Sequence, residues 1–68
     1  MRLVSQDKAT DIPYESVMVE LVGRNIEGVN IAGGTRYIFG QYDTRKDAEY
    51  AMKALRDSYR RNEAYFCF

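Results

Sequence analysis

The feature that most constrains this chain is a single amphipathic helix among segments that otherwise favour strands. Residues 43–61 carry one apolar stripe at helical spacing, made of Ala48, Ala51, Met52, Leu55 and Tyr59. Thr44 is a natural N-cap, because its hydroxyl can accept a hydrogen bond from a free amide of the first turn. One helix can cover only one face of a sheet, so the opposite face must meet solvent or another covering element.

The rest of the chain favours strands, because apolar and polar residues alternate in it. We expect strands at 2–6, 16–24, 28–32, 35–42 and 64–68, and an edge segment or connection at 11–15. Gly33-Gly34 is typical of a two-residue hairpin, and Gly40 inside its strand predicts a bulge or a close approach of the helix. Short connections favour antiparallel pairing. The expected fold is α+β: one domain over 1–68, a small antiparallel sheet in chain order β-β-β-β-α-β, and one helix packed on one face.

The composition argues against most catalytic chemistry. The chain has 68 residues, no histidine and one cysteine, Cys67. A Ser-His or Cys-His pair, an intramolecular disulfide and the common zinc ligand sets are therefore absent. The glycines form no phosphate-binding motif. We therefore expect a protein that is not an enzyme and that takes no cofactor and no metal.

The charge and the ends of the sequence bear on where the chain acts. Ten basic and ten acidic residues cancel, so the chain has no general attraction to nucleic acid or to an anionic membrane. No apolar run is long enough to span a bilayer, and the first ten residues do not resemble a signal peptide. With only one cysteine, these features predict a cytoplasmic protein without a membrane association.

The aromatic residues of 37–42 indicate an interaction surface. If Ile38 and Tyr42 face the helix, then Tyr37 and Phe39 point away from it, and Met18 and Val22 join them from the neighbouring strand. An exposed apolar surface of this kind usually marks a contact with another protein. The sequence thus predicts a homo-oligomer, such as a dimer, or a complex with a host protein. Two alternatives stay open: tyrosines on a solvent-facing strand, and a sheet that curls to bury its second face.

The run YIFGQYDTRKDAEYAM, residues 37–52, supports a second hypothesis. It is similar to the strand-to-helix unit of plant AP2-type domains and of the arm-binding domains of tyrosine recombinases, which share a G-x-aromatic-x-Thr-x-x-x-Ala run. In those families an arginine-rich strand ladder enters the major groove. The resemblance implies a small sheet-type DNA-binding domain that would use Arg24, Arg36, Arg45 and Lys46. The zero net charge and the absence of a run of strand arginines depart from that pattern.

A second resemblance covers about half of the chain. The segments MRLVSQD, DIPYE and YDT, the helix pattern A-x-x-A-M-x-x-L-R-x-x-Y and the closing YFCF are similar to short uncharacterised proteins of phages and prophages of Gram-positive bacteria. The family carries no assigned activity, so the resemblance transfers no functional residues. It implies a mobile-element origin and the cytoplasm of a bacterial host. Together with the aromatic surface, it predicts a non-catalytic interaction module with an anti-defence or host-takeover role.

Overall fold

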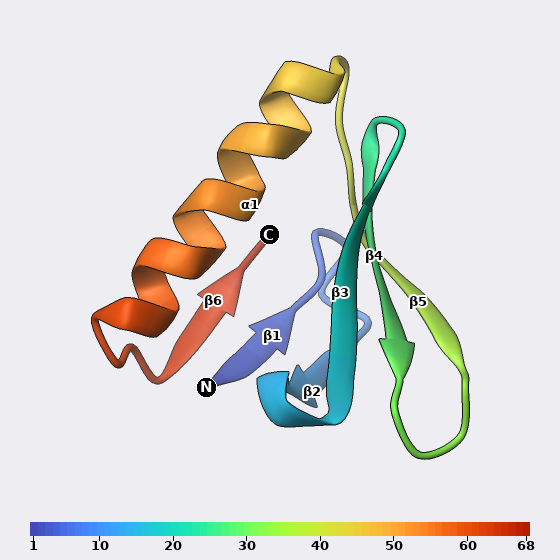
Figure 1. The fold of residues 1–68 in the computed structure, drawn as a ribbon, viewed down its shortest axis with the longest axis vertical. Coiled ribbons are helices and arrows are strands. Elements are labelled where there is room, and N and C mark those ends of the chain that lie inside the picture. The colour runs from blue at the N-terminus through green and yellow to red at the C-terminus, as the bar shows by residue number, and fades with distance from the viewer.

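The protein folds into two small sheets and one helix, and the computed structural model describes all residues from 1 to 68 (Figure 1). The elements in chain order are β1 (Arg2–Val4), β2 (Asp11–Pro13), a 3-10 turn (Tyr14–Ser16), β3 (Val17–Val22), β4 (Asn25–Asn30), β5 (Arg36–Gln41), α1 (Arg45–Arg60) and β6 (Tyr65–Cys67). The predicted α+β class is confirmed. Helix α1 is not long and apolar enough to cross a membrane.

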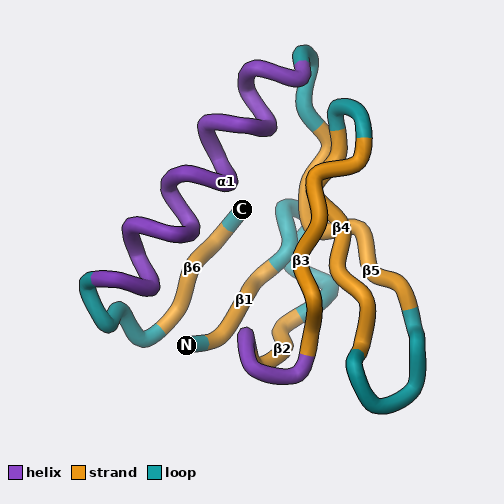
Figure 2. The backbone as a smooth tube through the Cα atoms, in the orientation of Figure 1, coloured by secondary structure: helices purple, strands orange, loops and turns teal.

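The predicted single sheet is wrong, because the strands divide into two sheets of three (Figure 2). The first sheet has the order β2-β1-β6, and the second has the order β3-β4-β5. Strand β6 pairs parallel to β1, not antiparallel as predicted, with Phe66 opposite Leu3, and the two strands lie side by side in Figure 1. The parallel pair requires a crossover connection, and α1 supplies the last part of it.

The first sheet is built around a tight turn between β1 and β2. The Ser5 N–H donates to the Thr10 carbonyl at 2.9 Å, and the Ser5 hydroxyl donates to the Asp7 carboxylate at 2.5 Å. Lys8 has a φ of 64°, the left-handed conformation that reverses the chain within this turn. The Ser5 hydroxyl also accepts from the Thr10 N–H, so this buried side chain is fully bonded. The turn brings β2 back antiparallel to β1, with Leu3 opposite Ile12.

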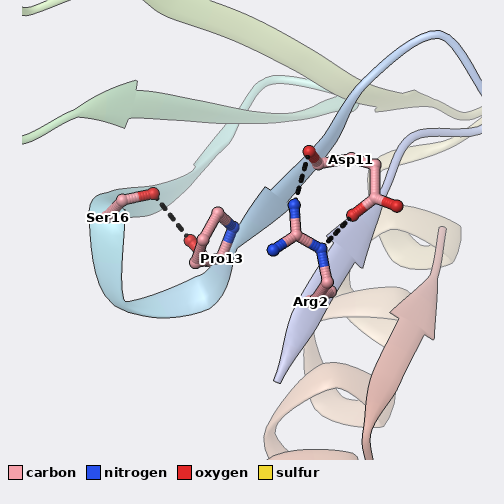
Figure 3. A network of polar contacts seen from close by, with 4 residues as sticks. All are labelled: Arg2, Asp11, Pro13 and Ser16. Atoms are coloured by element: carbon pink, nitrogen blue, oxygen red, sulfur yellow. Dashed lines mark hydrogen bonds and ion pairs between the residues drawn. The ribbon is translucent and has the colours of Figure 1, made fainter.

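Polar side chains then secure the outer edge of this hairpin (Figure 3). Arg2 donates from Nε to the Asp11 carboxylate at 2.6 Å and from Nη2 to the Asp11 carbonyl at 3.0 Å. The Ser16 hydroxyl donates to the Pro13 carbonyl at 2.8 Å, which closes the 3-10 turn. Both Arg2 and Asp11 are more than half exposed, so this ion pair contributes little to stability.

The second sheet is a meander whose first turn is tighter than predicted. Gly23, with a φ of 60°, and Arg24 alone connect β3 to β4. Strand β4 therefore begins at Asn25 rather than at residue 28, and Ile26, which lies between two of the predicted strands, is fully buried. The opposite holds for the second connection, where residues 31–35 form a longer loop than the predicted Gly33-Gly34 hairpin.

The helix agrees closely with the sequence pattern. Thr44 caps it as predicted, because its side-chain oxygen accepts from the Asp47 N–H at 3.1 Å. Ala48 and Leu55 are buried, and Met52 is half-buried. The small side chain of Ala48 allows α1 to approach the sheets closely.

The hydrophobic core lies between α1, the first sheet and the inner face of the second sheet. Its six buried members are Leu3, Val17, Ile26, Phe39, Ala48 and Leu55. The Phe39 ring stacks on Phe68 with 5.0 Å between ring centroids, and residues 66–68 extend this aromatic cluster. The first sheet and α1 together therefore cover the face that a single helix is too narrow to cover.

A β-bulge at Phe39 reverses the predicted orientation of β5. Glu27 is opposite Ile38 but Ile26 is opposite Gly40, so Phe39 is the extra residue of the pair. This confirms the irregularity that Gly40 predicted. The expectation that Tyr37 and Phe39 point away from the core is wrong, because Phe39 is 0% exposed while Ile38 is 51% exposed. Shifting a strand by one position exchanges its two faces.

Candidate functional site

The outer face of the second sheet is the side turned away from α1 and from the first sheet. Successive residues of a strand point to opposite faces, so the outer face can be read from the register. It is formed by Met18, Glu20 and Val22 of β3, Glu27 and Val29 of β4, and Arg36 and Ile38 of β5. Its apolar members are strongly exposed: Met18 is 59%, Ile38 51% and Val22 41% exposed. We call this set the outer face.

Three charged side chains form one cluster on the outer face. Glu20 and Glu27 lie directly opposite each other, which would be repulsive in isolation. Arg36 relieves the repulsion, with Nη1 at 2.8 Å from Glu27 Oε1 and Nη2 at 3.6 Å from Glu20 Oε1. The Glu27 side chain is only 12% exposed, so its hydrogen bond to Arg36 is largely shielded from water. Two carboxylates share one guanidinium, and the cluster therefore has a net charge of −1.

The structure places two of the four predicted partner-binding residues on this face. Met18 and Val22 are exposed there, whereas Phe39 is buried and Tyr37 is half-buried on the inner side. Ile38 is the residue that sequence reasoning missed. A signal for it was present in Gly28, a glycine in the interior of β4 that leaves room for an aromatic ring on the inner face.

The structure brings three of the four basic residues of the DNA-binding hypothesis together, Arg24, Arg45 and Lys46, whereas Arg36 lies apart from them. Arg24 donates to the Asp43 carbonyl at 3.2 Å and Arg45 donates to the Gly23 carbonyl at 3.4 Å, so both tie the β3–β4 turn to the start of α1. Lys46 follows in the first turn of the helix. Arg36 is instead held by two carboxylates on the outer face. An outer face of net negative charge would repel a phosphate backbone.

Metal-ligand clusters, reactive side chains and grooves are the other surface features that could form a functional site. No three His, Cys, Asp or Glu side chains are grouped so as to hold a metal ion, and Cys67 is exposed and unpaired. An open groove of about 510 Å³ lies beside the end of α1, lined by Tyr14, Arg56, Tyr59, Arg60 and Asn62. Tyr14 and Tyr59 stack within it at 4.9 Å between centroids. Its two arginines fit the helix C-terminus, where cations are favourable.

Comparison of the chain with protein-family models, with curated proteins and with solved structures finds no match. The class that fold and surface define is thus a small α+β domain with an apolar outer sheet face around a charged cluster.

Proposed function

We propose that this protein is a non-catalytic interaction module that binds another protein through the outer face. The observation that carries the proposal is the exposure of Met18, Val22 and Ile38 on one side of one sheet. Isolated exposed apolar residues are ordinary, but three on one face beside the half-buried Val29 form a patch. When a partner removes the Met and Ile side chains of such a patch from water, the free energy of the complex is lowered.

The charge of the outer face indicates the chemistry of the partner. The cluster of Glu20, Glu27 and Arg36 carries net charge −1, so two outer faces packed directly together would bury two like charges. A different protein that presents apolar side chains around one lysine or arginine would neutralise the cluster instead. We therefore propose a partner with such a surface, and, in keeping with the phage resemblance, a protein of a Gram-positive bacterial cytoplasm.

Affinity capture with matched variants tests this proposal. Immobilised wild-type protein and the Ile38→Glu and Met18→Glu variants would be exposed to the same Gram-positive lysate, with Tyr50→Glu as the control. Tyr50 is 72% exposed on α1, far from the outer face in the fold, so its variant carries the same added charge elsewhere.

We expect a protein that wild type and Tyr50→Glu retain equally and that both outer-face variants lose by at least about tenfold. An unpaired carboxylate buried at an apolar contact accounts for a loss of that size. If every retained protein binds Ile38→Glu and Met18→Glu as well as wild type, the outer face is not the contact surface.

A further inference from the structure

The two edge strands of the second sheet, β5 and β3, differ in the hydrogen bonds that other segments make to them. The edge at β5 is capped at its C-terminal end by Gln6, whose N–H donates to the Phe39 carbonyl at 2.8 Å and whose Oε1 accepts from the Gln41 N–H at 2.8 Å. No strand is hydrogen-bonded to β3 on the side away from β4. Strand β3 is six residues long, whereas the outer strands of the first sheet, β2 and β6, have three each.

The register shows which backbone groups of β3 are free. Ser16 bonds to Ile31 across the pair, so the even-numbered residues of β3 point their backbone groups toward β4. The odd-numbered residues Val17, Val19 and Leu21 point theirs outward. The Val17 N–H bonds to the Tyr14 carbonyl. The three outward carbonyls and the N–H groups of Val19 and Leu21 have no hydrogen-bond partner in the fold.

Strand β3 also lacks the devices by which soluble proteins usually protect an open edge. Residues 17–22, VMVELV, include no lysine, no proline and no bulge, and one acid is the only charge among them. Pro13 in β2 shows that another edge of the same molecule does carry such protection. A long apolar strand with five free backbone groups is a template for one more strand.

We propose that β3 pairs antiparallel with β3 of a second copy of this chain, about a two-fold axis that passes beside Val19. In this register each Val19 N–H donates to the Val19 carbonyl of the partner subunit. Each Leu21 N–H donates to the carbonyl of Val17 of the partner subunit. These four bonds satisfy four of the five free groups in each copy, and the occupied Val17 N–H is not needed as a donor.

Charge selects this register over its neighbour. With the axis at Val19, Met18 lies opposite Glu20 of the partner subunit on the outer face. Moving the axis by one residue to Glu20 places that residue directly opposite Glu20 of the partner subunit, and like charges in that position are destabilising. Moving it to Leu21 extends the pairing to Gly23, whose φ of 60° already belongs to the turn. The zero net charge of the chain offers no long-range repulsion between copies.

The dimer would place two outer faces side by side in one six-stranded sheet. From strand spacing and rise, three strands of six residues present roughly 300 Å² of projected sheet area, which is small beside the roughly 800 Å² that each partner buries in a standard interface. Two copies present about twice that area. The inference goes beyond the proposed function, because the edges can pair whether or not the outer face binds another protein.

Sedimentation equilibrium over a concentration series, with charge variants at residue 18, tests the pairing and its register together. Met18→Lys places an opposite charge across from Glu20 of the partner subunit, and Met18→Glu places a like charge there. Each occurs twice by symmetry, so we expect Met18→Lys to lower the dimer Kd and Met18→Glu to raise it, each by about 2- to 30-fold. Adding Glu20→Lys to Met18→Glu should restore the dimer.

A backbone variant and a control complete the test. Val19→Pro removes an N–H that the monomer leaves free, so we expect a folded monomer by circular dichroism and sedimentation. Ile38→Glu, on β5, should leave the dimer intact although we expect it to weaken capture of the partner protein, which separates this inference from the proposed function. A wild-type monomer at millimolar concentration, or a dimer insensitive to the charge at residue 18, overturns the inference.

Discussion

Replacing Gly28 by alanine tests whether the Phe39 ring packs against residue 28 in the core. A Cβ at residue 28 would clash with Cε2 of Phe39 and would lie 3.2 and 3.3 Å from two further ring carbons. The ring cannot move aside easily, because it is 0% exposed and stacks on Phe68. Overpacking of this kind costs about 1–3 kcal/mol, and the reduced entropy of the unfolded chain offsets about 0.4–1 kcal/mol. We expect Gly28→Ala to lose about 1–2 kcal/mol of unfolding free energy.

Thermal and urea unfolding followed by circular dichroism measure the effect. A loss of about 1–2 kcal/mol lowers Tm by roughly 4–16 °C in a domain of this size. Gly33→Ala is the matched control, since a Cβ there meets nothing within 4 Å and Gly33 is not among the glycines with positive φ, so its Tm should rise slightly. Phe39→Leu should cost less unfolding free energy in the Gly28→Ala background than in wild type, because the smaller side chain relieves the overpacking. If Gly28→Ala is as stable as Gly33→Ala, the inward placement of Phe39 is wrong.

Three further measurements probe single side chains. Tyr42→Phe should raise the unfolding free energy in urea by about 1 kcal/mol, because the buried Tyr42 hydroxyl has no hydrogen-bond partner; a loss instead would reveal a bond the structure lacks. Thr44→Ala should cost about 1 kcal/mol through loss of the helix N-cap, and unchanged stability would contradict the cap. The Ser58 hydroxyl bond lowers the pKa of Glu63 from its usual 4.5, so this contribution is present above pH 4.5 and is lost as the pH falls through the lowered pKa. The stability difference between wild type and Ser58→Ala, from urea unfolding at several pH values, should therefore shrink below pH 4.5; a difference that does not depend on pH would exclude the linkage.

Local signals predicted the elements whose energetics are local. The helix followed from its apolar stripe and from Thr44, and both operate within a few residues of sequence. Strand β3 followed from the alternation of Val17, Val19 and Leu21, and the register confirms that Met18 and Val22 lie on the opposite face. Met18 and Val22, the part of the outer face that lies on β3, could therefore be predicted from the sequence.

The parts that were predicted wrongly depend on contacts between distant segments. One extra residue at Phe39 reverses β5, and this ring packs over Gly28 and against Phe68, neither of which is a sequence neighbour. Ile38 therefore replaced Tyr37 and Phe39 on the outer face. The division into two sheets depends likewise on Phe66 meeting Leu3, residues that no local pattern relates. Alternation gives the period of a strand, whereas tertiary packing decides its phase.

The pairing of residues 2–4 with residues 65–67 has a consequence for how the protein is made. The β3–β4–β5 meander has its pairing partners within residues 17–41, but Leu3 and Phe39 lack their aromatic neighbours until Phe66 and Phe68 have emerged from the ribosome. Contacts between such distant residues form slowly, since the loop between them must close first. The nascent chain would thus hold an incomplete core, and folding would complete only once residues 65–68 have left the exit tunnel.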